Sequence, residues 1–214
     1  MKLYAYFRSS ASYRVRIALA LKGLPVEVEQ IHLTRHGGEQ LQAPYLGLNP
    51  QGLVPALVDE GQLYTQSLAI IEYLDETHPA LPLLPPHAGE RAHVRALALA
   101  IACDIHPLNN LRVLRYLVQE MRVSEADKDK WYRHWCELGL GALEAQLAGD
   151  PRVGRFCFGD TPTLADCCLI PQIYNAQRMH SDLSKLPTLM RINAACLALP
   201  AFAQAAPEAQ PEAE

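Results

Sequence analysis

The sequence lacks the marks of several large protein classes, and each absence narrows what the chain can do. No stretch is apolar and long enough to span a bilayer, and Met1 leads almost at once into a strand-like pattern with no leader segment. Charges of one sign form no run, and the formal net charge of -4 disfavours nucleic-acid and polybasic membrane contacts. We therefore expect a cytoplasmic protein without a nucleic-acid or membrane partner.

Cysteine is present but follows no functional pattern. The six cysteines form no C-x-x-C pair and no metal-like cluster with histidine, so neither a disulfide framework nor a metal site is expected. A dinucleotide loop is also missing, because Gly139-Leu140-Gly141 has no third glycine and no preceding strand. We expect reduced, mostly buried thiols at Cys103, Cys136, Cys157, Cys167, Cys168 and Cys196.

Half of the 214 residues are hydrophobic, which is enough for one or two cores. The N-terminal part alternates strand and helix patterns, and its order is similar to the thioredoxin-like arrangement. The predicted elements are a strand over 2–7, a helix over 12–22, a strand over 26–33, a polar stretch over 34–48 with at most a short helix, a hairpin turning at Glu60-Gly61, and a helix from about Ser67.

The chain changes character at a proline-dense stretch, residues 78–86, which predicts a linker. Beyond it the apolar residues recur at helical spacing throughout. We therefore predict an α/β plus all-α protein, with a thioredoxin-like domain over residues 1–81 and an all-helical domain over residues 88–214.

Three features of the helical part carry structural predictions. Pro107 is expected to bend a long helix over 90–121, because it removes one backbone hydrogen bond. Thr163 and Asp166 have the spacing of a capping box at a helix start. The last stretch, 201–214, is rich in Ala, Pro, Gln and Glu and is expected to be loosely held.

Two predicted helix N-termini carry hydroxyl groups. After Arg8 the chain has Ser9, Ser10 and Ser12 just where the first helix opens, and Ser67 stands at the start of a later helix. Free N–H groups and a positive dipole end gather at such a place, which suits a carboxylate, a phosphate or a thiolate.

The order of elements and three motifs together resemble the glutathione transferase superfamily over essentially the whole chain. Val54-Pro55 is similar to the cis-proline dipeptide that pairs with the cysteinyl part of glutathione. Gln66-Ser67 is similar to the pair that holds the γ-glutamyl carboxylate, and 163–166 is similar to the family's capping box. The resemblance implies glutathione as cofactor, and a homodimer in which the thioredoxin-like domain of one chain meets the helical domain of the other.

Within the superfamily, residues 8–19 resemble the zeta-class signature, and 103–110 resemble bacterial members. Ala11 departs from the signature, which has cysteine there, so a mechanism using a protein thiol is not expected. The resemblance makes Ser9 the first candidate to stabilise the glutathione thiolate and Ser10 the second, while both serines could instead only cap the helix. The bound thiol would act as a borrowed nucleophile.

The resemblance also implies roles for other residues. Because the class acts on dicarboxylates, arginines are expected in the pocket. Arg8 is the first candidate, for both catalysis and substrate binding. Arg178 and Arg112 are weaker candidates, because each could instead be an ordinary solvent-exposed arginine on a helix. Arg14 is expected to contact the cofactor or only support the turn. The full set of expected cofactor contacts is Ser9, Ser10, Arg14, Gln40, Gln51, Val54, Pro55, Gln66, Ser67, His106, Asn109 and Asn110, the last three sharing one face of the bent helix.

The activity implied is glutathione-dependent cis-trans isomerisation of maleylacetoacetate in tyrosine and homogentisate breakdown. Maleylpyruvate, from gentisate, is the close alternative substrate. A general glutathione transferase is a second class of function, which the expected arginines disfavour. A non-catalytic glutathione-binding protein is a third, which the retained Ser9, Gln66 and Ser67 disfavour.

Overall fold

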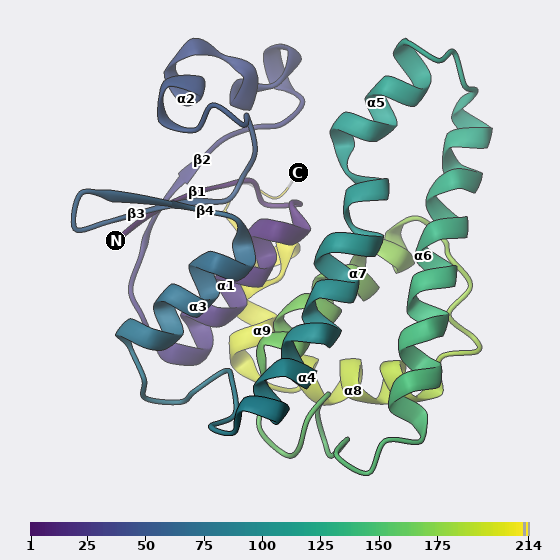
Figure 1. The fold of residues 1–214 in the computed structure, drawn as a ribbon. Helices are drawn as coiled ribbons and strands as arrows, with labels where there is room; N and C mark the ends of the chain where they lie inside the picture. The colour runs from purple at the N-terminus through teal and green to yellow at the C-terminus, as the bar shows by residue number, and fades with distance from the viewer. Residues whose placement is uncertain (212, 214) are drawn as a thin grey trace. The chain divides into compact units, whose positions relative to one another are not determined.

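The computed structural model describes residues 1–211 and 213. These residues form two compact units, which we describe separately (Figure 1). Unit 1 contains Met1–Leu83 together with Ala198–Glu214, and unit 2 contains Leu84–Leu197.

Unit 1 is built on a four-stranded sheet with the order β2-β1-β3-β4. β1 (Lys2–Ala5) runs parallel to β2 (Glu27–Gln30) and antiparallel to β3 (Ala56–Asp59), which pairs with β4 (Gln62–Thr65). Glu60 and Gly61, with φ of 48° and 79°, join β3 to β4 as the tight turn that the sequence predicts. This mixed sheet confirms the thioredoxin-like prediction.

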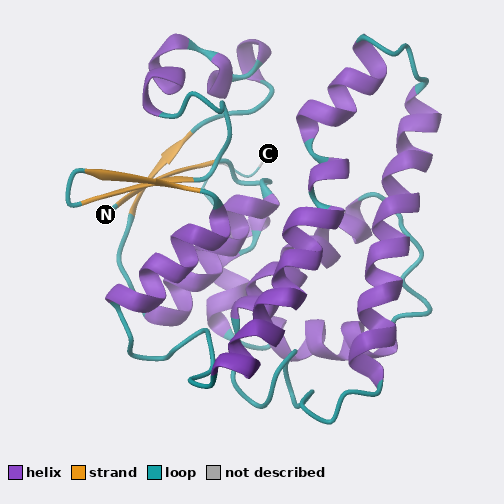
Figure 2. Cartoon of the chain, in the orientation of Figure 1, coloured by secondary structure: helices purple, strands orange, loops and turns teal. Residues whose placement is uncertain are grey.

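Helices cover both faces of this sheet (Figures 1 and 2). α1 (Ser10–Lys22) and α3 (Ser67–Thr77) lie on one side, and the short α2 (Ala43–Leu48) lies on the other. The core between the sheet and α1 and α3 is mostly apolar, and the burial of its apolar side chains is the main source of stabilising free energy in such a layer. Its most deeply buried members include Leu3, Ile17, Leu57, Ile70 and Leu74.

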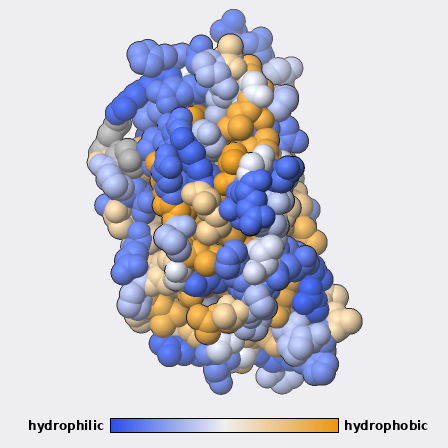
Figure 3. All heavy atoms as spheres, turned by 90° about the vertical axis from the view of Figure 1, so that its left-hand side faces the viewer, coloured by the Kyte–Doolittle hydropathy of each residue, from blue (hydrophilic) through white to orange (hydrophobic). Residues whose placement is uncertain are grey.

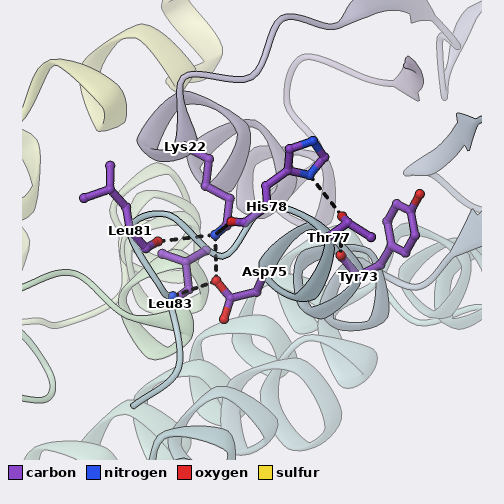
Figure 4. A network of polar contacts seen from close by, with 7 residues as sticks. All are labelled: Lys22, Tyr73, Asp75, Thr77, His78, Leu81 and Leu83. Atoms are coloured by element: carbon purple, nitrogen blue, oxygen red, sulfur yellow. Dashed lines mark hydrogen bonds and ion pairs between the residues drawn. The ribbon is translucent and has the colours of Figure 1, made fainter. Parts of the chain in front are cut away.

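A buried ion pair ties the ends of α1 and α3 to the linker (Figure 4). The Lys22 ammonium lies 2.7 Å from Asp75 Oδ1, and the two side chains are 1% and 9% exposed. Lys22 also donates to the carbonyls of His78 and Leu81, while Asp75 Oδ1 accepts the Leu83 N–H at 2.8 Å. With these partners the buried charges are compensated, as buried charges must be to persist.

The C-terminal segment is more ordered than its composition predicts. α9 (Pro200–Ala205) packs on α1, and Phe202 is completely buried. The Tyr13 hydroxyl donates to the Phe202 carbonyl at 3.2 Å, and Arg16 Nε donates to the Ala205 carbonyl at 2.9 Å. The expectation of a loosely held tail over 201–214 is therefore wrong for α9; residues 212 and 214 lie outside the described part.

This packing also bears on the division of the chain. The sequence places residues 88–214 in one helical domain, whereas Ala198–Glu214 group with unit 1 in the structure. The buried Phe202 side chain and the carbonyls of Phe202 and Ala205 attach this segment to α1. No local sequence pattern identifies these partners.

Unit 2 is all-helical, as predicted. Pro107 does more than bend a helix, because the expected run over 90–121 is divided at this residue into separate helices. Without an N–H at Pro107 and with its ring against the preceding turn, the α-helical ladder gives way to π and 3₁₀ turns. The elements are α4 (Ala88–Leu99), the π-helical η3 (Ala100–Ile105), the 3₁₀ turn η4 (Pro107–Asn109), α5 (Leu111–Gln119), α6 (Glu125–Ala148), α7 (Leu164–Arg178) and α8 (Pro187–Leu197).

The predicted capping box at the start of α7 is confirmed. Asp166 Oδ2 accepts the N–H of Thr163 at 2.8 Å and its hydroxyl at 3.0 Å, and Oδ1 accepts the N–H of Cys157 at 2.9 Å. Burial raises the pKa of the Asp166 carboxyl, and this effect outweighs the hydrogen bonds from Cys157 and Thr163, which lower it. Five of the six cysteines are buried and all are free thiols, as expected.

The lengths of the helices and the molecular surface add three observations. Among the described residues, no helix is both long and apolar enough to cross a membrane. Figure 3 shows a face on which hydrophilic and hydrophobic residues are interspersed. The exposed large hydrophobic residues of unit 1 are Val28, Leu41, Leu63 and Leu81.

Candidate active site

The N-terminus of α1 is capped by a serine side chain. Ser9 has extended backbone angles and its Oγ accepts the N–H of Ser12 at 3.2 Å. A hydroxyl has one donor and two acceptor positions, so Ser9 can cap the helix and still donate its own proton. The capping interpretation and the functional one are therefore compatible at the same atom.

The two candidate serines differ in accessibility. Ser9 is half-buried, whereas Ser10 lies inside the first turn with only 5% of its surface exposed. Ser12 is fully buried, and its Oγ lies 3.4 Å from the backbone N of Tyr6 as acceptor. Of the three serines, Ser9 is the one that a ligand at the helix N-terminus reaches most readily.

Arg8 stands beside this serine and is exposed. Its Nη2 donates to the Tyr6 hydroxyl at 2.9 Å, and its guanidinium carbon lies 5.0 Å from the centre of the Phe7 ring. The hydrogen bond and the aromatic contact restrict an otherwise mobile cation and leave other N–H groups for a ligand. No sequence motif marks Tyr6, but its place two residues before Arg8 on an extended segment puts both side chains on one side and is the signal that could have identified it.

The N-terminus of α3 is tied to α1 by Arg14. This arginine is 2% exposed, and its Nη1 donates to Ser67 Oγ at 3.2 Å. Gln66 precedes the helix with a φ of 68°, and its Nε2 donates to Gln51 Oε1 at 3.0 Å. Gln66 and Gln51 are both exposed. Four expected residues thus meet around the two helix N-termini.

Val54-Pro55 is a cis peptide that immediately precedes β3. The Leu53 carbonyl before it accepts the Tyr45 hydroxyl at 2.6 Å and Asn49 Nδ2 at 2.8 Å. Burial raises the pKa of Tyr45 to about 12, so the hydroxyl stays a donor. Val54 belongs to a buried apolar cluster that supports this side of the sheet, made of Tyr6, Phe7, Ile31, Tyr45 and Val54.

Gln40 follows a tight loop and is 6% exposed. Its Oε1 is buried and has no hydrogen-bond partner among the residues that the structure describes. The loop is held at His32, whose Nδ1 accepts the Arg35 N–H at 2.9 Å. Burial and the charge of Arg35 lower the pKa of His32. His32 could not be identified from the sequence, because a lone histidine after a predicted strand belongs to no motif.

The three candidates His106, Asn109 and Asn110 of unit 2 lie where the helix divides at Pro107. His106 is half-buried and its Nε2 lies 3.4 Å from Asn110 Nδ2. Asn110 caps α5 by accepting the Arg112 N–H at 3.1 Å. Asn109 instead is buried and donates to the Tyr132 carbonyl at 3.1 Å, which is a structural contact with α6.

The two arginine candidates of unit 2 are both exposed. Arg112 lies in the first turn of α5, and Arg178 ends α7, where a cation is favoured by the helix dipole. Burial raises the pKa of Tyr132, and the nearby Arg178 opposes this shift. Arg178 therefore lies next to one polar group of the unit 2 interior. Within the described residues, no group of three His, Cys, Asp or Glu side chains could hold a metal ion.

Comparison with known families matches both parts of the chain. The model of the glutathione S-transferase N-terminal domain matches residues 3–86, and that of the C-terminal domain matches residues 137–204. A probable maleylacetoacetate isomerase of Vibrio cholerae serotype O1 is 54% identical over 211 residues, covering 99% of this chain and 97% of that protein.

Solved structures of relatives are similar in fold to this chain over its full length. A holo structure of a maleylpyruvate isomerase, described as a bacterial zeta-class glutathione-S-transferase, is similar with a TM-score of 0.97 at 49% identity, covering 100% of both chains. A maleylacetoacetate isomerase from Methylobacterium extorquens AM1, solved with bound malonate and glutathione, is similar with a TM-score of 0.96 at 41% identity, again covering 100% of both.

Proposed function

The chain belongs to the glutathione S-transferase family, and from that premise we propose that it is a glutathione-dependent cis-trans isomerase acting on maleylacetoacetate. The observation that carries the proposal is the α1 N-terminus, where the half-buried Ser9 hydroxyl and the exposed, aromatic-held Arg8 stand side by side. A hydroxyl suits a thiolate, and a guanidinium suits a carboxylate, so this one place has partners for both reactants.

The residues of unit 1 fit glutathione. The α3 N-terminus has free N–H groups beside Ser67 and Gln66, which suit the γ-glutamyl carboxylate. Gln40 offers a buried acceptor, Oε1, that lacks a protein partner in the described part of the chain and suits an N–H of a peptide ligand. Val54-Pro55 supports the same assignment through its resemblance to the superfamily dipeptide that pairs with the cysteinyl part of glutathione.

Bound glutathione would supply the nucleophile, adding as a thiolate to the cis double bond so that the bond becomes single, rotates and re-forms when the thiolate leaves. The protein has to keep the thiol deprotonated. Ser9 donates a hydrogen bond to sulfur, and the positive end of α1 adds to the effect. We assign no protein thiol to the mechanism, because Ala11 stands at the position of the class cysteine.

Arg8 binds and orients a carboxylate of the substrate. Its contacts with Tyr6 and Phe7 fix the guanidinium before the substrate arrives, which lowers the entropy lost on binding. Ser10 supports the turn from inside the helix. Arg112, Arg178 and His106 are the residues of unit 2 that we propose for contact with the substrate or cofactor, and Asn110 holds His106.

Maleylpyruvate is the second candidate substrate, favoured by the full-length similarity to a maleylpyruvate isomerase. Both substrates share the cis bond conjugated to a carbonyl, so Ser9 and Arg8 would serve either. We further propose that the protein acts in the cytoplasm, in aromatic catabolism, as a homodimer. The exposed Leu63 on the edge strand β4 supports an interface there.

The test is an absorbance assay of the purified protein with maleylacetoacetate and with maleylpyruvate, each with and without glutathione. Fast glutathione-dependent loss of one substrate is the expected result and identifies the pathway. No turnover of either would end the isomerase proposal and leave a broad transferase. Sedimentation at several concentrations tests the dimer, and a monomer at micromolar protein would remove it.

A further inference from the structure

His32 occupies a buried position immediately after β2, at the base of the loop that leads to Gln40. Its side chain is 8% exposed, and its ring meets the Tyr6 ring edge-to-face with centroids 4.9 Å apart. The ring Nδ1 accepts the backbone N–H of Thr34 at 3.3 Å and that of Arg35 at 2.9 Å. Two backbone donors on one nitrogen require that Nδ1 be unprotonated, so the ring is neutral with its proton on Nε2.

Glu39 closes the same loop from the other end. Its Oε2 accepts the His32 backbone N–H at 2.6 Å, and its own N–H donates to the His32 carbonyl at 2.8 Å. The chain between these residues passes through Gly37 and Gly38, with φ of 81° and 115°. Two of these four hydrogen bonds, those to Nδ1, depend on the imidazole, so the His32 side chain helps to hold the loop closed.

Gln40 is the next residue after the closed loop and lies against its backbone. A Cβ added to Gly38 would lie 2.7 Å from Gln40 Nε2, which shows how closely the amide packs on this glycine. A change in the 32–39 loop therefore moves the Gln40 side chain directly. The buried Gln40 Oε1 is the acceptor that the proposed function assigns to glutathione.

We propose that His32 is a positioning residue for glutathione binding: its neutral ring holds the 32–39 loop closed through Nδ1 and thereby aims the Gln40 amide at the cofactor. The inference rests on the proposed function for its ligand, but its loop geometry stands independently. It predicts that acid weakens glutathione binding, because a protonated Nδ1 becomes a donor and repels the two N–H groups.

The charged and titratable groups around His32 determine the pH at which its ring becomes protonated and the loop opens. Burial, Arg35, Arg8 and His36 lower its pKa, and Glu39 raises it, with a lowered pKa as the outcome. Tyr6 faces the ring through its aromatic edge contact. The loop should therefore stay closed at neutral pH and open only below the ordinary histidine range.

The experiment compares His32→Phe with His32→Asn in the full chain. Phenylalanine keeps a ring but removes the acceptor, whereas asparagine places Oδ1 near the position of Nδ1 and does not titrate. Calorimetry measures the glutathione Kd between pH 5 and 8, and amide hydrogen exchange measures protection at Arg35. Turnover at saturating glutathione separates kcat from KM.

The Phe variant should bind glutathione about tenfold more weakly, as the loss of roughly two hydrogen bonds predicts, with kcat within about twofold. The Asn variant should restore binding and remove its acid dependence. Unchanged binding in the Phe variant, or no rescue by Asn, would overturn the proposal. If the unsubstituted protein bound no glutathione, the proposed function and the ligand half of this inference would both fail, while Arg35 protection would still decide whether His32 closes the loop.

Discussion

Single residues at the α1 N-terminus combine structural and chemical roles. Ser9 caps the helix through one lone pair of Oγ and keeps its proton for a ligand, so the capping and catalytic interpretations need not compete. The sequence predicts this serine from its place after a strand and before a helical pattern. It does not predict Tyr6 or His32, because no motif marks them, although both contacts are local: Tyr6 lies two residues before Arg8, and His32 Nδ1 accepts N–H groups two and three residues further on.

Substituting Ser9 with alanine separates its two roles. We expect turnover to fall by about 10²-fold or more, since a donor to the developing thiolate is lost, with little change in the glutathione Kd. Ser124→Ala is the matched control, because Ser124 caps α6 in unit 2 by the same contact, to the Asp127 N–H at 3.1 Å. Equal turnover in both variants would move the role to Ser10 or to backbone N–H groups.

The Tyr6 hydroxyl offers a second test at this scale. Tyr6→Phe removes the acceptor that holds Arg8 while keeping the aromatic core. We expect the KM for the dicarboxylate substrate to rise by about fivefold, the value of one modest hydrogen bond, with the glutathione Kd unchanged. Steady-state kinetics with each reactant varied in turn measures both. A rise in the glutathione Kd instead would mean that Tyr6 supports the cofactor rather than Arg8.

At the level of elements, the predictable parts are those with local signals. The hairpin turn at Glu60-Gly61 and the capping box of Thr163 and Asp166 each depend on a few neighbouring residues, and both predictions are confirmed. The break at Pro107 is more complete than predicted, because a proline shows that the helical ladder is interrupted but not which turn replaces it.

The ion pair between the ends of α1 and α3 gives a prediction about stability. Asp75→Ala leaves the Lys22 charge buried with only carbonyl partners and frees the Leu83 N–H. We expect the free energy of unfolding to fall by about 3 kcal/mol. Lys130→Ala is the control, because its pair with Asp127 is exposed, with side chains 72% and 58% accessible, and should be nearly neutral. Urea unfolding measures the free energy of unfolding of both variants. Similarly small losses in the two would show that the buried ion pair contributes little to stability.

At the scale of the whole molecule, local sequence patterns predict the division of the chain but not the contacts between distant segments. The change from an α/β to an all-helical pattern predicts a division of the chain, and the structure groups Met1–Leu83 with Ala198–Glu214, apart from Leu84–Leu197. The assignment of the C-terminal segment to unit 1 depends on Phe202 and Ala205 meeting α1, which are contacts between residues far apart in the chain. Periodicity within a segment cannot identify such partners.

The pH dependence of stability belongs to this scale. Burial lowers the pKa of His32 and of His93; for His93 it outweighs the nearby Asp150, whose carboxylate is bound by Arg152. The unfolded chain then binds more protons than the folded one, so stability is full above about pH 6.5, the ordinary histidine value, and falls as the pH drops through the folded pKa values.

Urea unfolding at pH 7.5, 6.5 and 5.5 measures this dependence. His93→Gln should flatten part of the decline, because the substituted side chain does not titrate. The raised pKa of Asp166 acts in the opposite direction at lower pH, and the depressed pKa of Asp150, about 2, takes effect only in stronger acid. Constant stability across this range would contradict the account of the two histidines.

The central claim is that the α1 N-terminus, through Ser9, keeps glutathione as a thiolate for the isomerisation. The most direct measurement is the ultraviolet absorbance of the thiolate in the complex, titrated with pH for the unsubstituted protein, Ser9→Ala and Ser124→Ala. We predict a thiol pKa clearly below the free value of about 8.5, raised again in Ser9→Ala alone. A bound thiol that titrates like the free one, or the same lowered pKa in all three proteins, would contradict the claim.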